Sequence, residues 1–238
     1  MTTIDMNATL GSVVRDHPAL AREFERRGID YCCHGQQSVW DACHNADLDP
    51  NIVIAELEAA ARTSTPEPWA EFAPAELVDH IEAVHHRYLW DEMPRLDALF
   101  EKVRDVHGER HPELVTGASV FAMVRADLEP HMQKEEVVLF PMIRQLAVAE
   151  QAPEFHCGRI SNPITMMMME HERTGALLVE LRAAADDYRI PGDACASYRA
   201  LYEGLAQMEA DVHLHIHKEN NLLFPAVVEL EAKLRAGS

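Results

Sequence analysis

Apolar side chains recur every three or four residues along most of the chain, which is the spacing of one face of an α-helix. Long stretches with this spacing are separated by short loops that contain Gly, Pro or both. We expect four long helices, over about 74–105, 113–149, 163–187 and 193–234. Long helices on short connections predict an all-α fold built on an up-down four-helix bundle.

The start of the chain has a different pattern. Glycines and a proline interrupt the first 62 residues, where we expect shorter helices over about 9–15, 17–27, 36–45 and 50–62. The following stretch, TSTPEPWAEFAP, lacks helical spacing and is typical of a linker. We therefore predict a small helical domain over 1–62, a linker over 63–74 and the bundle over 75–238.

Composition narrows the class of protein. Aromatic residues make up 6% of the chain, and the abundant Ala, Leu, Glu and Met favour helix over strand. A formal net charge of −19 repels nucleic-acid phosphates and anionic lipid headgroups. No stretch reaches the roughly 18 uninterrupted apolar residues that a membrane span needs, and the first residues lack the pattern of a secretion signal. Five cysteines without a C-x-x-C pair suit a reducing compartment and disfavour a cysteine-based zinc site. We expect a cytoplasmic protein that binds neither nucleic acid nor membranes.

One sequence frame, H-x-x-K-E-x-x-x-L-F-P, occurs twice. It reads HMQKEEVVLFP at 131–141 and HIHKENNLLFP at 215–225, 84 positions later. The copies fall on the second and fourth predicted helices, so the bundle reads as two copies of one helical hairpin. Pro141 and Pro225 occupy the same place in both copies, and we expect the helix to bend alike after each Leu-Phe. Pro130 predicts a kink in the second helix.

In both copies a histidine and a glutamate occupy positions of the apolar, core-facing stripe. The stripe of the second helix is Phe121, Val124, Leu128, His131, Glu135, Val138 and Met142. The stripe of the fourth helix is Leu201, Leu205, Met208, Val212, His215, Glu219 and Leu222. Burying an unpaired carboxylate costs several kcal/mol, and neither stripe contains an Arg or Lys. A metal ion is therefore the expected counter-charge.

The other two long helices each contribute one histidine to the same seam. His86 is in register with Leu89, Met93, Leu96 and Phe100, and His171 is in register with Ile164, Met168, Gly175 and Leu178. A lone core histidine is usually a hydrogen-bonded packing residue, but six ionisable groups in symmetric register favour ligation. Three neighbouring histidines fall off the stripes and are expected in solvent or beside the ligands: His85, His213 and His217.

The donor set predicts two metal ions. Four histidines and two glutamates exceed what one tetrahedral ion needs, whereas two ions that share the carboxylates use every group. Iron is favoured over manganese because the site is rich in imidazole. Asp127 and Glu170 could orient ligands, although a solvated surface position is the more common case for such residues. The methionines at 166–169 are interpreted as core filling rather than a soft-metal site.

These segments resemble the repair-of-iron-centres proteins, which are di-iron members of the hemerythrin-like group. GIDYCCHG resembles their short N-terminal domain, and DHIEAVHHRYL, HMQKEEVVLFPMI, MEHERTGALL and HLHIHKENNLLFP resemble their four ligand-bearing helices. The resemblance implies, as ligands, His86, His131, Glu135, His171, His215 and Glu219, with both glutamates bridging. Oxygen-carrying hemerythrins have a second histidine on the third helix where this chain has Gly175, and an aspartate where it has Asn220.

The same resemblance implies a function. It describes a cytoplasmic protein, often a homodimer, that restores iron–sulfur proteins damaged by oxidative or nitrosative stress, with two oxo-bridged non-haem iron ions. Donation of ferrous iron and binding or reduction of nitric oxide both stay open as mechanisms, and an oxygen or nitric oxide sensor is a further alternative. The insertion around 150–162 and the extra histidines depart from the family pattern.

Cys32 and Cys33 precede a helix that is expected to begin near Gln36. A thiol close to a helix N-terminus has a lowered pKa and is a better nucleophile or ligand. The pair is therefore interpreted either as a thiolate relay toward the damaged cluster or as packing within the small domain, and both interpretations stay open.

Overall fold

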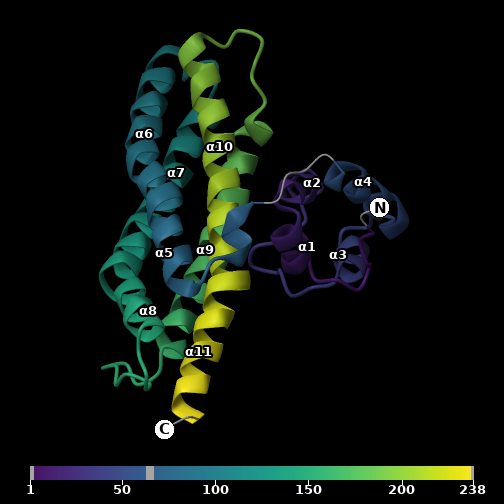
Figure 1. Cartoon of the computed structure of the whole chain (residues 1–238). Helices are drawn as coiled ribbons and strands as arrows, with labels where there is room; N and C mark the ends of the chain where they lie inside the picture. Colours follow the sequence, from purple (N-terminus) through teal and green to yellow (C-terminus); the bar gives the residue numbers. More distant parts are fainter. Residues whose placement is uncertain (1–2, 63–66, 237–238) are drawn as a thin grey trace.

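The computed structural model describes residues 3–62 and 67–236. Within these ranges every named element is helical, which confirms the expected all-α fold. Figure 1 shows long helices side by side, with the small N-terminal helices against one flank. No helix in the described ranges combines the length and the apolar character needed to cross a membrane.

The N-terminal region folds into short helices, of which α1, α3 and α4 begin at a capping side chain. Its elements are α1 (Leu10–Asp16), η1 (Pro18–Leu20), α2 (Ala21–Glu25), α3 (Val39–Asn45) and α4 (Pro50–Ala61). The Ser38 hydroxyl accepts a hydrogen bond from the Asp41 amide at 3.0 Å and thereby starts α3. The helix expected from Gln36 thus begins three residues later, because the capping serine and not the spacing sets its start.

The expected linker lies partly outside the described residues, which resume at Glu67. Its described part contains the 3₁₀ turn η2 (Pro68–Glu71), in which the Trp69 side chain is buried. The Lys218 Nζ lies 4.7 Å from the centre of the Trp69 ring. This stretch is therefore anchored to the bundle by an aromatic side chain.

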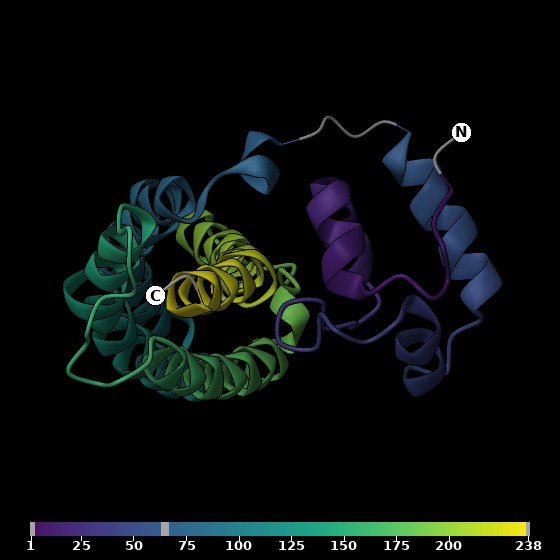
Figure 2. The same cartoon turned by 60° about the horizontal axis from the view of Figure 1, so that its bottom comes forward.

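The bundle consists of four long helical paths. The first is α5 (Pro74–Ile81), η3 (Glu82–His86) and α6 (Arg87–His107), and the second is α7 (Glu113–Lys134), η4 (Glu135–Leu139) and α8 (Phe140–Ala147). The third is α9 (Ser161–Ala184), followed by the turn η5 (Asp186–Tyr188), and the fourth is α10 (Ala196–Lys218), η6 (Glu219–Leu223) and α11 (Phe224–Ala236). Figure 2 looks along these paths and shows them grouped around a common interior.

Within the described ranges, η3, η4 and η6 are π-helical turns, and each begins or ends at a predicted ligand. η4 and η6 stand directly before the Phe-Pro of the repeated frame. Pro141 and Pro225 have no amide hydrogen to donate to the carbonyl four residues earlier, which favours the wider turn. The second helix, in contrast, continues as α7 through Pro130 without interruption.

The π turns correct the predicted stripes. Val138 is 39% exposed whereas Leu139 is 1% exposed, so the buried position lies one residue later than regular spacing predicts. Leu223, at 0% exposure, likewise takes the core position expected for Leu222. A π turn accommodates one extra residue and therefore shifts the core face by one position.

The predicted set of buried positions on α9 is also corrected. Met167 and Thr174 are buried, whereas Met168 is 43% exposed. Steps of three then four and steps of four then three both connect Ile164 to His171, and hydrophobic spacing does not distinguish them. Of the methionine run, only Met167 fills core space, since Met166 and Met169 are exposed as well.

The small domain docks on the bundle through a close backbone contact. Asn221 in η6 donates from its Nδ2 to the Cys32 carbonyl at 3.0 Å. A Cβ atom at Gly35 would lie 2.1 Å from Asn221 Oδ1, so only glycine permits this approach. The Cys32–Cys33 segment is thereby held against the helix that carries Glu219.

Candidate metal centre

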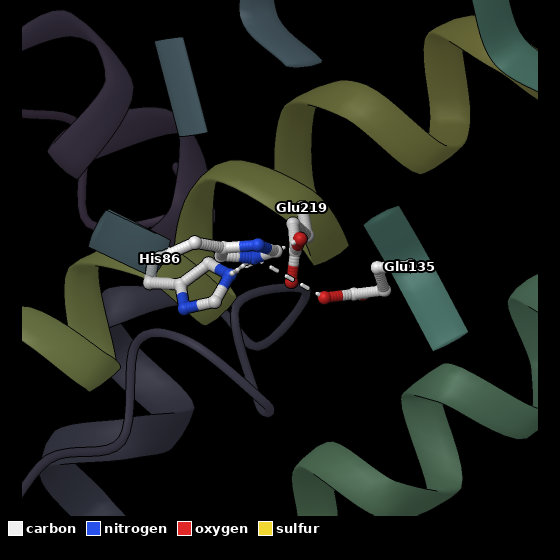
Figure 3. A group of neighbouring side chains, drawn as sticks. His86, Glu135 and Glu219 are labelled. Atoms are coloured by element: carbon white, nitrogen blue, oxygen red, sulfur yellow. Dashed lines mark hydrogen bonds and ion pairs between the residues drawn. The ribbon is translucent and has the colours of Figure 1, made fainter. Parts of the chain in front are cut away.

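The six predicted ligands meet in the interior of the bundle. They come from all four helical paths and are at most 2% exposed: His86, His131, Glu135, His171, His215 and Glu219. Their donor atoms form two groups, in each of which all atoms lie within 4.8 Å of one another. The first group is His86, Glu135, His215 and Glu219, and the second is His131, Glu135, His171 and Glu219. Figure 3 shows His86, Glu135 and Glu219 pointing toward one shared space.

The histidine pairs have the separation expected for two ligands of one ion. The Nε2 atoms of His86 and His215 are 3.2 Å apart, and those of His131 and His171 are 3.0 Å apart. Two nitrogens bound at about 2.1 Å and at right-angled to tetrahedral geometry lie roughly 3.0–3.4 Å apart. Each pair can therefore ligate a single cation.

Each glutamate reaches both groups, one oxygen to each. Glu135 Oε2 lies 3.4 Å from His86 Nε2, and its Oε1 lies 3.3 Å from His131 Nε2. Glu219 Oε1 and Oε2 lie 3.2 Å from the Nε2 atoms of His215 and His171. Among the described residues these four buried oxygens have no hydrogen-bond partner. Orphaned carboxylate oxygens between facing imidazoles fit a pair of cations bridged by both glutamates.

The electrostatics of the protein show what the cations would replace. Burial and the charge of Glu219 favour protonation of Glu135, yet His131 and His86 lower its pKa to about 2. Burial works against the charged form of His131, yet Glu135 and Glu219 raise its pKa to about 9. Imidazolium protons thus balance the carboxylates in the metal-free protein, and bound metal ions would displace those protons.

Three of the four predicted ligand histidines have an acceptor on their outer nitrogen, which fixes the ring and would make it a stronger ligand. His86 Nδ1 donates to Glu136 Oε1 at 2.9 Å, and His131 Nδ1 donates to Glu170 Oε2 at 2.8 Å. His171 Nδ1 donates to the Asn220 amide oxygen at 2.8 Å. Glu136 and Asn220 were missed from the sequence, although both directly follow the glutamate of the repeated frame.

Asp127 does not take part in this arrangement. Its Oδ2 accepts from the Thr174 hydroxyl at 2.7 Å, and its other oxygen pairs with Arg173. This corrects the expectation that Asp127 could orient a ligand, whereas Glu170 lies where that expectation placed it. Both oxygens of Asp127 are instead engaged by side chains of α9.

The fourth ligand histidine differs from the others. His215 Nδ1 is buried and has no hydrogen-bond partner within the described part of the chain. Repeat symmetry would place a carboxylate at position 85, as Glu170 directly precedes His171, but this chain has His85. The rings of His85 and His215 stack at 5.4 Å with a 7° angle between their planes. The two groups are therefore unequal in the support of their ligands.

A buried lysine next to this group was missed as well. Lys218 is 2% exposed and donates from its Nζ to His85 Nε2 at 2.7 Å and to His80 Nε2 at 2.9 Å. Burial lowers the pKa of Lys218 to about 8. Lys218 lies off the predicted stripe, which indeed contains no Lys or Arg, and it faces η3 and the Trp69 ring instead.

The expectation that the extra histidines lie in solvent or beside the ligands is corrected in part. His85 and His217 are 1% and 0% exposed, so neither lies in solvent. His85 Nδ1 donates to Asp211 Oδ1 at 2.9 Å. The His217 ring packs against Tyr31 of the small domain, 5.6 Å between centroids. His217 is buried because Trp69 of η2 and Tyr31 of the small domain cover its face of α10.

The cysteine pair lies close to the centre, but Cys32 lacks the expected activation. Cys32 is 3% exposed, and its pKa is raised by the Cys33 thiol, by burial and by Asp30. This contradicts a lowered pKa for Cys32, since α3 begins too late to act on it. The Cys32 carbonyl accepts a hydrogen bond from Asn220 Nδ2 at 3.4 Å. The side-chain amide of Asn220 therefore contacts both Cys32 and, through its oxygen, His171. Cys33 is half-buried and lines a pocket of about 300 Å³.

Comparison with known proteins identifies relatives over nearly the whole chain. A model described as the hemerythrin HHE cation binding domain matches residues 77–227, and one described as a domain of unknown function (DUF542) matches residues 6–61. The iron–sulfur cluster repair protein YtfE of Enterobacter sp. (strain 638) is 33% identical over 216 residues, covering 91% of this chain and 94% of that protein. The protein of the same name from Escherichia coli O81 (strain ED1a) is 32% identical over 217 residues, with the same coverage. This chain therefore belongs to the hemerythrin HHE cation-binding family, in the repair-of-iron-centres group that carries the DUF542 domain at its N-terminus.

Proposed function

We propose that this protein restores iron–sulfur clusters damaged by oxidative or nitrosative stress by supplying ferrous iron from a di-iron centre. The kinship with proteins named for iron–sulfur cluster repair supports the process. The two buried histidine–glutamate groups support a centre for two ions. Its partners would be damaged iron–sulfur proteins of the cytoplasm, and we retain the prediction of a homodimer, which light scattering would measure.

The donor set favours iron. Four imidazoles and two shared carboxylates are the mixed ligation used by non-haem iron in four-helix cores. Two such ions with an oxo bridge would supply a store of exchangeable iron. The residues of the chain hold that store through the six ligands, orient three of the imidazoles, and exclude water by near-complete burial.

The observation that carries iron donation is the unequal support of the two groups. His215 has no acceptor on its Nδ1, while His131 and His171 in the other group both have one. An imidazole without such an acceptor is a weaker ligand. The buried ammonium of Lys218 further disfavours a cation near His215. Lys218 donates to the ring nitrogen of His85, and the His85 ring stacks on the His215 ring. The group that contains His215 is therefore the one suited to release its ion.

This inequality predicts biphasic iron release to a chelator. Glu170→Gln should accelerate the slow phase by about tenfold, within the range typical for loss of an orienting carboxylate. His85→Glu should slow the fast phase, because it restores a carboxylate beside His215. Stopped-flow absorbance of the iron–chelator complex measures both rates, and a single phase in the wild type would contradict the inequality.

The repair itself is tested by iron transfer. An iron–sulfur enzyme inactivated with nitric oxide or peroxide should regain activity with the iron-loaded protein, and only slightly with the metal-free protein. The matched control is free ferrous iron at the same concentration in the presence of a weak chelator. Equal recovery with the metal-free protein would exclude iron supply as the mechanism.

The cysteine pair is tested separately. We propose that Cys33, the more accessible thiol, contacts the damaged cluster beside the pocket. Replacing Cys32 and Cys33 with serine should lower repair at least tenfold while the iron content stays unchanged. Cys195→Ser, at an exposed cysteine in another part of the chain, is the control. If the double variant repairs clusters as well as the wild type, then Cys32 and Cys33 only pack within the small domain.

Reduction of nitric oxide at the same centre is a second candidate, favoured by one observation. The pocket beside Cys33 is lined by the apolar side chains of Ile164, Met168 and Phe224, and the Phe224 ring stacks on that of His171 at 6.0 Å. A small apolar molecule could approach the centre there. Catalytic consumption of nitric oxide with a reductant would support this candidate, and a strictly stoichiometric loss would not.

A further inference from the structure

A second group of potential ligands lies far from the centre described above. It is at the end of the bundle where α6 turns into α7 and where the loop before α10 passes, at the top of Figure 1. His107, His111 and Asp193 offer ligand atoms that all lie within 4.8 Å of one another. His86 and His107 lie at opposite ends of α6, which places the two groups roughly 30 Å apart at 1.5 Å per residue.

The backbone of the turn brings the two histidines together. The His107 carbonyl accepts from the amides of Arg110 and His111, both at 2.9 Å. The turn therefore folds back over the helix end, and the two imidazole rings lie 6.1 Å apart between centroids. The packing of α6 against this turn thus sets the spacing of both imidazoles.

The imidazole of His107 is the feature that indicates a bound ligand. It is 4% exposed, yet neither of its ring nitrogens has a hydrogen-bond partner among the described residues. A buried polar group without a hydrogen-bond partner destabilises the folded state. The neighbouring Tyr198 does not relieve it, because the hydroxyl of Tyr198 donates to Glu113 at 3.2 Å. A cation on His107 would satisfy a nitrogen that the protein leaves unpaired.

The surrounding residues already form the outer support of such a site. His111 Nδ1 donates to Glu113 Oε1 at 2.7 Å, which leaves its Nε2 directed at Asp193 Oδ1, 3.1 Å away. A carboxylate behind a histidine is the arrangement that orients metal-binding imidazoles. Arg110 pairs with the second oxygen of Asp193 at 2.8 Å and holds that carboxylate in place.

We propose that His107, His111 and Asp193 form a mononuclear site for a divalent transition-metal ion of the zinc class. Two imidazoles and one carboxylate, with a solvent-facing fourth position, are a recurrent zinc donor set. The site opens to solvent on the side of Asp193, which is exposed, so an ion can enter. The bound ion ties the α6–α7 turn to the loop before α10 and closes this end of the bundle.

Zinc titration of the full chain tests the proposal, with the iron centre loaded beforehand. Cys32 and Cys33 are replaced by serine in all samples, because Asp30, Cys32 and Cys33 are another group that could hold an ion. Competition with a chromophoric chelator should reveal one tight zinc equivalent. His111→Gln and His107→Gln should each abolish that equivalent, and Asp193→Asn should weaken it at least tenfold.

Two further measurements make the assignment specific to this site. His156→Gln, at an exposed histidine of the 150–162 loop, should leave the zinc equivalent unchanged. Zinc should also protect His111 from diethyl pyrocarbonate, measured by mass spectrometry of the modified peptides. An equivalent that survives His111→Gln, or protection confined to other histidines, would overturn the proposal and leave His107 a packing residue.

Discussion

Glu219→Gln is expected to reduce the iron content of the reconstituted protein to at most one ion per chain. Glu219 is fully buried, and its two oxygens face one histidine of each group, 3.2 Å away. Glutamine preserves the shape but removes the negative charge that both cations need and offers only one strong acceptor. Metal analysis of protein reconstituted anaerobically with ferrous iron measures the loss.

Glu135→Gln should have the same effect, since the oxygens of Glu135 face one histidine of each group from the other copy of the repeated frame. The double variant should bind no iron at the centre. Glu229→Gln, at an exposed position on α11 where Glu229 pairs only with Lys233 among the described residues, is the matched control and should retain full iron content. Full retention in Glu219→Gln, with an unchanged circular dichroism spectrum, would refute the bridging role.

Removal of the metal is expected to lower the melting temperature by roughly 10 °C. A ligand present at about 1,000 times its dissociation constant stabilises the native state by about 4 kcal/mol. For a chain of 150–250 residues, each kcal/mol corresponds to about 2–4 °C. Without the ions, four histidines and two carboxylates are left close together in the core, where the carboxylates raise the pKa of His131 and His86. Differential scanning calorimetry with and without a chelator measures the change.

The Glu135→Gln/Glu219→Gln double variant is the control for this measurement. It binds no iron, so its melting temperature should not respond to the chelator. If the chelator lowers the melting temperature of this variant as much as that of the wild type, then the stabilising ion is bound elsewhere, for example at His107, His111 and Asp193.

The six candidate ligands that meet in the core could be predicted from the sequence because their signal is local. A histidine or glutamate in an apolar stripe is visible within one helix, and the repeated frame at 131–141 and 215–225 supplied an internal check. The boundaries of the long helices were predictable to within three residues for the same reason, since loops with Gly and Pro separate the periodic segments.

The failures have two causes, which are local departures from regular α-helical spacing and contacts between distant segments. Val138 and Leu222 were assigned to the core because regular α-helical spacing was assumed, whereas π turns move the buried position to Leu139 and Leu223. His217 was assigned to solvent or the ligand surroundings because no pattern within α10 indicates that the small domain covers it.

The sequence by itself determined an all-helical chain whose bundle core contains four histidines and two glutamates. Periodicity and chemical type are carried by residues near one another in the chain, so these conclusions needed no coordinates. Only the tertiary structure decided which oxygen faces which imidazole, that Glu136 and Asn220 orient ligands, and that His215 and His107 lack partners. Those facts depend on residues dozens to more than a hundred positions apart, whose distances are set by helix packing and by docking of the small domain.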